Sequence, residues 1–166
     1  MTDAEIIDAI LEREGGYIAH ASDRGGATKF GVTAATLGEW RNLGRPASYD
    51  EVKHLAVSEA RAIYLALYIE KPNLGALPTA LKPMVVDDAV LSGTETAIKT
   101  LQQVLGVTAD GVCGPKTLAA AHLAPPKTEV ALVTARCLRY GRIVQRDPEQ
   151  VVFLVGWLRR ALDFLA

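Results

Sequence analysis

The sequence predicts a mainly all-α protein with a small β-hairpin or irregular excursion near residues 17–33. Apolar side chains recur at three- and four-residue spacings along most of the chain, which is the period of amphipathic helices. Helix caps and proline or glycine stops divide this pattern into segments of ordinary helix length. The glycine-rich stretch 17–33 is the exception, because side chains over residues 27–32 alternate as in a pair of short strands.

The first predicted helix begins at a capping box formed by Thr2 and Glu5, and it ends at the Gly15-Gly16 pair. Its apolar stripe comprises Ile6, Ile7, Ile10 and Leu11. After the excursion, we expect helices over residues 34–41, 48–55, 58–70, 79–91, 94–105, 115–122, 128–146 and 148–165. The second of these begins at another capping box, and two of them begin with proline, whose missing N–H costs nothing in a first turn.

The composition fits one globular domain over residues 1–166, with 49% hydrophobic and 22% charged residues. Lys and Arg number 18 against 19 Asp and Glu, for a net charge of −1. Since nucleic-acid binding generally needs a basic surplus, no nucleic-acid partner is expected. Cys113 and Cys137 form no CxxC pair and have no histidine at ligand spacing, so we expect free thiols, no metal site and no cofactor.

The N-terminal residues 1–5 are acidic, where a secretory signal peptide would be basic. The longest apolar run covers residues 151–158, far short of the roughly 20 residues that span a bilayer. We therefore expect a soluble monomer without stable membrane association, made in the bacterial or host cytoplasm.

Glu14 is the most informative single residue. It follows Ile10 by four residues and Ile7 by seven, which places it on the apolar stripe of the first helix. Partial burial and the negative end of the helix dipole both favour a protonated carboxyl at such a position. A carboxyl that keeps its proton near neutral pH is what a general acid needs to protonate a glycosidic oxygen. The alternative is a frayed helix end that points to solvent.

Asp23 and Thr28 follow within the glycine-rich stretch. Asp23 lies in a predicted turn beside Gly25 and Gly26, where backbone N–H groups and water favour an ionised carboxylate, and the Thr28 hydroxyl would hold a water or support that carboxylate. A protonated Glu and an ionised Asp divide the work of glycoside hydrolysis between them. Taken singly, Asp23 is also a common turn former and Thr28 a common strand residue.

Several segments carry a family resemblance. They are Glu14-Gly15-Gly16-Tyr17, GGATKFGVT at 25–33, VDDAV at 86–90, DGVCGPKT at 110–117 and GWLRR at 156–160. Together they resemble glycoside hydrolase family 108, whose members are bacterial and phage N-acetylmuramidases with a lysozyme-like helical fold. The resemblance covers nearly the whole chain. It implies that residues 1–92 form the catalytic part of a single muramidase domain, and that the helical part 93–166 resembles a peptidoglycan-binding segment.

The resemblance implies that Glu14 is the catalytic acid. Asp23 and Thr28 follow in the order of the Glu, Asp, Thr triad of phage-type lysozymes, although the interval between them is one residue shorter here.

The expected substrate contacts are Tyr17 and Lys29 in the first two motifs, Asp87 in the central helix, and His20. His20 lies where relatives commonly have Asn-Asp-Pro, and a histidine near the cleft would alter the pH profile, whereas in a solvated loop it would have no role.

The segment 110–117 also has a purely structural interpretation, as an Asp-Gly turn before a Gly-Pro helix start. The arginines gathered in the last two predicted helices form either a solvated face or a surface that attracts an anionic wall.

The sequence thus predicts a muramidase that hydrolyses the β-1,4 bond between N-acetylmuramic acid and N-acetylglucosamine in peptidoglycan glycan strands. Made in the cytoplasm, it would need a holin or secretion device to reach the wall, which favours a phage or prophage endolysin or a relative recruited to secretion. Two alternatives stay open: a lytic transglycosylase, which releases a 1,6-anhydro product, and a non-catalytic cell-wall-binding module. Retention or inversion depends on the separation of the two carboxylates.

Overall fold

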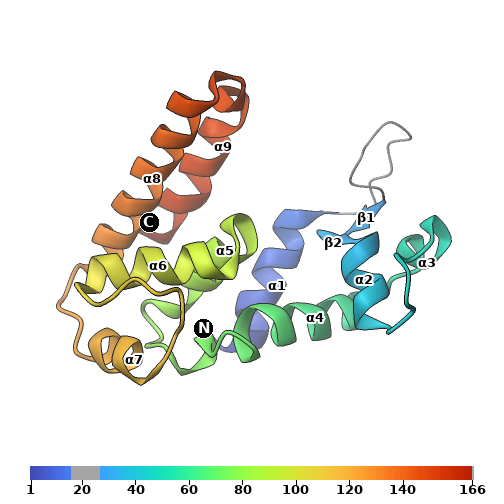
Figure 1. Cartoon of the computed structure of the whole chain (residues 1–166), viewed down its shortest axis with the longest axis horizontal. Coiled ribbons are helices and arrows are strands. Elements are labelled where there is room, and N and C mark those ends of the chain that lie inside the picture. Colours follow the sequence, from blue (N-terminus) through green and yellow to red (C-terminus); the bar gives the residue numbers. More distant parts are fainter. Residues whose placement is uncertain (16–26, 166) are drawn as a thin grey trace. The chain divides into compact units, whose positions relative to one another are not determined.

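The computed structural model describes residues 1–15 and 27–165. Over these residues the protein has nine α-helices and one two-stranded sheet, which confirms the mainly all-α prediction (Figure 1). The chain divides into two compact units, Met1–Ile69 and Glu70–Ala166. This division falls before helix α5 (Lys82–Ser92), and the single domain with parts 1–92 and 93–166 stays a prediction.

Unit 1 contains a short hairpin and four helices. Its elements are α1 (Asp3–Glu14), β1 (Thr28–Lys29), β2 (Val32–Thr33), α2 (Ala34–Trp40), α3 (Tyr49–Lys53) and α4 (Val57–Leu65), and the last continues into the π-helix η1 (Ala66–Glu70). The strands are antiparallel, with Thr28 opposite Thr33 and Lys29 opposite Val32. α1 packs on α4 through the predicted apolar stripe, all four members of which are buried.

Both predicted capping boxes of unit 1 are present. In the first, the Thr2 N–H donates to Glu5 Oε2 at 2.7 Å, and the Glu5 N–H donates to the Thr2 hydroxyl at 3.3 Å. α1 ends where Gly15 takes a φ of +75° and its N–H bonds to the Leu11 carbonyl. A glycine tolerates this conformation because it has no Cβ, so the last helical residue is Glu14.

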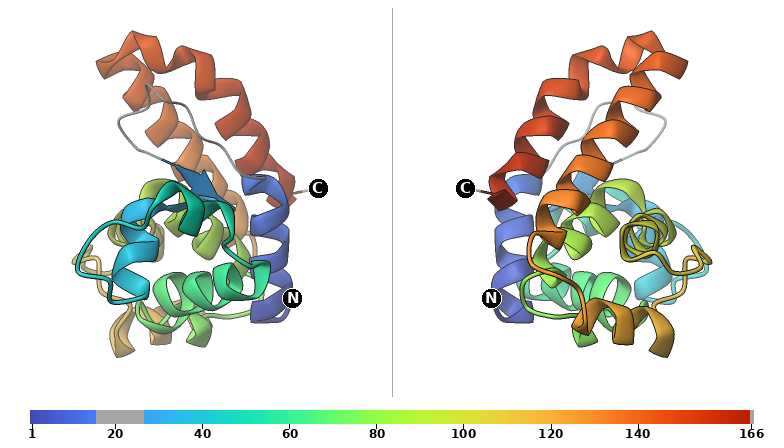
Figure 2. Two further views of the ribbon diagram at one scale, coloured as in Figure 1. Left: turned by 90° about the vertical axis from the view of Figure 1, so that its right-hand side faces the viewer. Right: turned by 90° about the vertical axis from the view of Figure 1, so that its left-hand side faces the viewer.

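Unit 2 is built on helix pairs. Its elements are η2 (Leu74–Ala76), α5, α6 (Thr94–Leu105), α7 (Pro115–His122), α8 (Thr128–Arg146), η3 (Pro148–Gln150), α9 (Val151–Leu162) and η4 (Asp163–Leu165). α5 packs on α6, and α8 packs on both α6 and α9. Figure 2 shows α8 and α9 side by side as a helical hairpin. Cys113 and Cys137 are free thiols.

Three predicted helices differ from the observed ones. The helix expected at 58–70 changes to a π-helix at Ala66, and the helix expected at 148–165 is divided into η3, α9 and η4. The helix expected from Thr79 begins at Lys82, with Pro83 in its first turn, where the missing N–H costs no hydrogen bond. None of the helices in the described ranges combines the length and apolar character of a membrane span.

A buried charge network joins α5 to α8 and α9. Asp87, which is 1% exposed, accepts from Arg136 and from Arg160, each at 2.9 Å. Asp88 accepts from Arg139 at 3.0 Å and lies 3.4 Å from Arg136. Because both carboxylates are desolvated, their charges are tolerated only with these guanidinium partners.

The Asp87→Asn substitution is expected to lower the free energy of unfolding by about 3–5 kcal/mol, because it leaves the guanidinium groups of the network with uncompensated charge. Urea unfolding followed by circular dichroism measures the change. Glu149→Gln, at an exposed position of unit 2, is the control and should stay within about 0.5 kcal/mol of the wild type. Wild-type stability in Asp87→Asn together with lost activity would instead favour the predicted substrate contact.

Candidate active site

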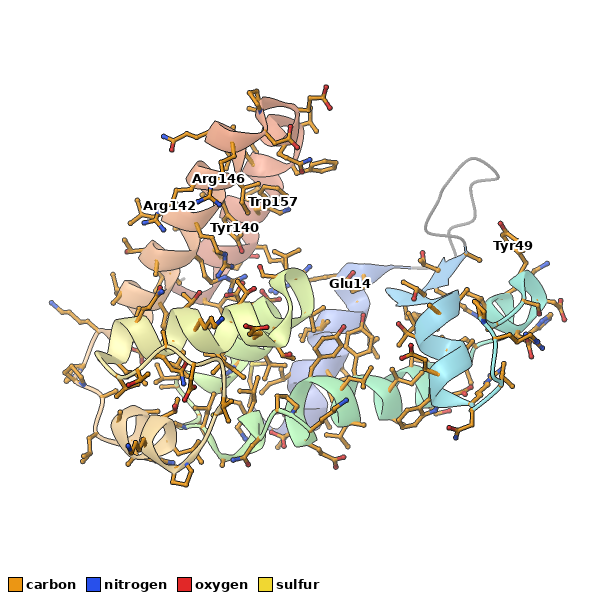
Figure 3. All side chains as sticks on the ribbon, viewed as in Figure 1. Glu14, Tyr49, Tyr140, Arg142, Arg146 and Trp157 are labelled. Atoms are coloured by element: carbon orange, nitrogen blue, oxygen red, sulfur yellow. The ribbon has the colours of Figure 1, made fainter. Side chains whose placement is uncertain are left out.

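The structure places Glu14 at the end of α1 that adjoins the hairpin (Figure 3). Its side chain is half-buried, in line with its position one turn after the buried Ile10. The exposed acids of the same helix, Glu5 and Glu12, lie outside the apolar stripe. Glu14 is therefore partly withdrawn from bulk water, as are Asp3 and Asp8 of the same helix.

The turn between β1 and β2 lies directly against the Glu14 side chain. Gly31, in this turn, has a φ of +72°. A Cβ on Gly31 would lie 3.1 Å from Glu14 Oε2 and 3.2 Å from Glu14 Cγ, and it would overlap the Tyr64 hydroxyl. Only glycine allows the turn to come this close, so the hairpin backbone forms one wall around the carboxyl group.

Two tyrosines of α4 and η1 lie at the same place. The buried Tyr64 hydroxyl donates to the Phe30 carbonyl at 2.9 Å and so holds the hairpin turn onto α4. The rings of Tyr64 and Tyr68 pack with their centroids 5.2 Å apart. Tyr68 belongs to the π-helix η1, and such widened turns recur at functional sites.

Tyr68 is electrostatically coupled to Glu14. Burial raises the pKa of Tyr68 above its usual value, and the negative charge of Glu14 raises this pKa further. The phenol therefore stays neutral at physiological pH and keeps its proton for donation. The arrangement provides a carboxyl group, a neutral donor and a rigid backbone wall within unit 1.

The other predicted site residues have different placements. Thr28 begins β1 and is half-buried on the hairpin that carries Gly31. The Lys29 ammonium donates to the Lys53 carbonyl at 2.7 Å, so it fastens the hairpin to α3. Tyr17, His20 and Asp23 lie outside the described residues.

Asp87 lies in unit 2, where both its carboxylate oxygens accept from arginine. These ion pairs explain its burial without a substrate, and its predicted sugar contact is still a prediction.

Sequence reasoning missed the roles of Gly31, Tyr64 and Tyr68. Gly31 belongs to the motif at 25–33, but the close contacts that require glycine there come from Glu14 and Tyr64, which are distant in the sequence. The four-residue spacing of the two tyrosines places them on one helix face, but such spacing does not distinguish a core from a cleft.

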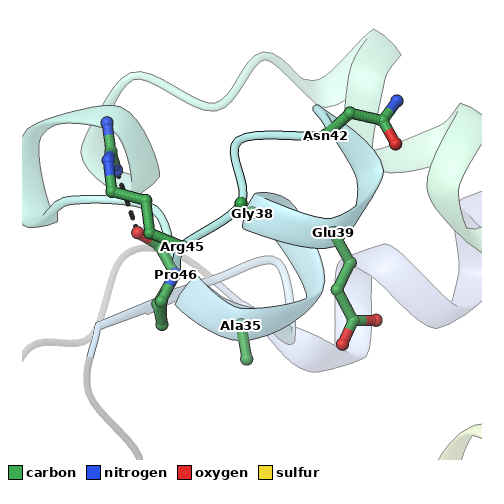
Figure 4. Close-up of a pocket in the computed structure, with 7 residues that line it drawn as sticks. Ala35, Gly38, Glu39, Asn42, Arg45 and Pro46 are labelled. Atoms are coloured by element: carbon green, nitrogen blue, oxygen red, sulfur yellow. Dashed lines mark hydrogen bonds between the residues drawn. The ribbon is translucent and has the colours of Figure 1, made fainter.

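A separate hollow of about 580 Å³ lies beside α2 and holds none of the predicted site residues (Figure 4). Arg45, on its rim, donates to the Pro46 carbonyl and to Glu51, both at 2.9 Å. Within the described ranges, no three His, Cys, Asp or Glu side chains are grouped as metal ligands would be.

Two family models define the class of the protein. Residues 7–93 match glycosyl hydrolase 108, and residues 96–162 match the predicted peptidoglycan domain. The protein is a glycoside hydrolase that acts on peptidoglycan.

More particularly, the chain belongs to the glycosyl hydrolase 108 family, as its resemblance indicated. The structure of SagA from Brucella abortus is similar to it, with 36% identity over 98% of this chain and 94% of that one, and a TM-score of 0.76. No curated protein matches the sequence.

Gly31→Ala is expected to reduce peptidoglycan hydrolysis by about tenfold or more, because the added methyl group displaces Glu14 or Tyr64. The control is Gly93→Ala, which has a similarly positive φ of +86° and no atom within 4 Å of the added Cβ. It suffers the backbone strain alone and should keep wild-type turnover per folded molecule. Equal turnover in both variants would show that the close approach of the turn is not needed.

Glu14→Gln is expected to lower the pKa of Tyr68, since it removes a negative charge near the phenol, while burial keeps this pKa above its ordinary value. Carbon-13 NMR of labelled tyrosine, assigned with Tyr68→Phe, follows the titration. Glu12→Gln, at an exposed position of the same helix, should leave the titration unchanged. An unshifted Tyr68 in Glu14→Gln would contradict the coupling.

Proposed function

We propose that the protein is an N-acetylmuramidase that hydrolyses the β-1,4 bond between N-acetylmuramic acid and N-acetylglucosamine, with Glu14 as the general acid. The observation that carries the proposal is the half-buried position of Glu14 against the Gly31 turn. A carboxyl group so placed is shielded from water on one side by backbone and is still partly exposed to solvent. Membership of a glycoside hydrolase family supplies the reaction class.

In the proposed reaction, Glu14 donates its proton to the glycosidic oxygen as the bond from that oxygen to the anomeric carbon breaks. Water adds to the anomeric carbon, and its proton passes to a carboxylate. Asp23 supplies the negative charge on the opposite face of the sugar, and Thr28 supports Asp23 or the attacking water. Glu14 has the same first role whether Asp23 acts as a base or as a nucleophile.

The hairpin and the tyrosines serve this step by limiting motion. The Tyr64 bond to the Phe30 carbonyl fixes the turn, and the turn in its place restricts the rotamers open to Glu14. A general acid held near its reacting geometry loses less entropy in the transition state. Tyr68 stays a neutral phenol, so it can donate a hydrogen bond and does not compete for the proton of Glu14.

The biological setting that we propose is that of a phage or prophage endolysin, or a relative recruited to secretion. It would be stored as a monomer in the cytoplasm and would reach the wall through a holin or secretion device. The free thiols of Cys113 and Cys137 suit a reducing compartment. Expression with and without a holin, followed by cell lysis, tests this setting separately from the chemistry.

The bond specificity is tested by digesting purified sacculi, reducing the products with borohydride and analysing them by mass spectrometry. A muramidase leaves reduced N-acetylmuramic acid at the new ends. Reduced N-acetylglucosamine would identify a glucosaminidase, and 1,6-anhydro ends that resist reduction would identify a lytic transglycosylase. We expect Glu14→Gln to lower the rate by a factor of about 10² or more, as loss of a general acid does.

Glu12→Gln is the matched control, because it removes a carboxylate from an exposed position of the same helix. It should digest sacculi at the wild-type rate. A folded Glu14→Gln protein with wild-type activity would contradict the proposed mechanism.

A further inference from the structure

Unit 2 has a groove between α6, α7 and the start of α8, with a volume of about 470 Å³. We propose that this groove binds the peptide stems of peptidoglycan. The proposal rests on peptidoglycan as the substrate and concerns a place on the chain separate from Glu14. The volume of the groove is within the range of small-ligand sites.

The segment 110–117, which resembles a peptidoglycan-binding motif, has its polar groups engaged within unit 2. The buried Gln102 amide donates to Asp110 at 2.7 Å, to the Val112 carbonyl at 3.0 Å and to Thr117 at 3.0 Å, and its oxygen accepts from the Gly111 N–H at 2.9 Å. These bonds explain the motif as a folded loop. The polar groups of this segment are therefore not available to a ligand, and a binding surface of unit 2 lies elsewhere.

The groove exposes apolar surface that the fold leaves uncovered. Leu123, on its rim, is 84% exposed, more than any other large hydrophobic side chain in the described part of the chain. Leu105, Pro125, Pro126 and Ala131 continue the apolar lining. Contact with a ligand would remove this surface from water, which is favourable.

Lys127 provides the charge. Among the side chains that line the groove, it is the one cation, and no acid is present. It is exposed, and neither a hydrogen bond nor an ion pair of its ammonium is found within the described residues. Its backbone has a φ of +73°, and its carbonyl accepts from the Val130 and Ala131 N–H groups at the start of α8. The helix start thus fixes the residue that carries the charge.

The chemistry of this lining fits the peptide part of the polymer better than its sugars. Sugars are usually held by aromatic faces and by many polar groups, whereas this lining has no aromatic ring. Its only hydroxyl, that of Thr128, donates to the Pro125 carbonyl at 2.6 Å. Peptide stems carry the methyl groups of alanine and free carboxylates, which match an apolar groove with a single cation.

The test measures binding apart from cleavage. Protein with Glu14→Gln, which prevents digestion in the proposed mechanism, is titrated with the soluble stem pentapeptide L-Ala-γ-D-Glu-diaminopimelate-D-Ala-D-Ala, and amide NMR shifts are recorded. We expect shifts around residues 123–131, and a Kd raised at least about fivefold by Lys127→Glu or by Leu123→Ser. Lys127→Arg keeps the charge and should restore binding.

The matched controls are Lys116→Glu and Val112→Ser, which change an exposed lysine and an exposed apolar side chain of unit 2 outside the groove. Both variants should bind the pentapeptide with the same Kd as protein whose groove is unaltered. Loss of binding in these variants as well, or unchanged binding in both groove variants, would overturn the proposal. Amide shifts around residues 123–131 that appear with peptide-free glycan strands but not with the pentapeptide would also overturn the proposal.

The two proposals fail separately. Protein with wild-type Glu14 and an altered groove should still cleave peptide-free glycan strands at its normal rate, while its retention on intact sacculi falls. If the wild type does not cleave such strands but still binds the pentapeptide, the muramidase proposal fails and the groove proposal stands.

Discussion

The candidate active site depends on the close packing of the β1–β2 turn against Glu14, which requires that Gly31 have no side chain. Tyr64 holds this packing in place, because its hydroxyl donates to the Phe30 carbonyl of the same turn. A hairpin with two residues in each strand is not stable alone, so its place depends on these contacts and on the Lys29 bond to α3. The turn, the Glu14 carboxyl group and α4 thus form one connected arrangement.

The acids of the two units show how surroundings decide the role of a carboxylate. Asp87 and Asp88 are fully buried, and their arginine partners fix both as structural anions. Glu14 is half-buried against the Gly31 turn, and its negative charge raises the pKa of Tyr68. Partial exposure suits the general acid that we propose, since such a group must reach the substrate to transfer its proton. Sequence position alone does not distinguish them, since all three lie on helices with apolar neighbours.

Local signals predicted most of the helices, because caps and stops act within a few residues. The helices at 94–105, 115–122 and 128–146 have the predicted bounds, and both capping boxes are formed. The π-helix at Ala66–Glu70 was missed because its widened turn is not encoded in local periodicity. Glu14 is singled out by its place on the apolar stripe, and its catalytic role stays a prediction. Its contact with Gly31, and the engagement of Asp87 by distant arginines, depend on tertiary packing, which a single sequence does not reveal.

Peptidoglycan repeats a disaccharide that carries a peptide, so a protein with one site for each part meets both on the same polymer. A weak peptide site then acts by raising the effective concentration of the glycan at the catalytic site. Modest affinity is an advantage here, since a groove that released the stem slowly would hold the enzyme at bonds already cut. A shallow apolar groove with one cation has the character of such a site. In the two proposals taken together, weak binding in unit 2 and acid catalysis in unit 1 are complementary requirements of an enzyme that works along an insoluble chain.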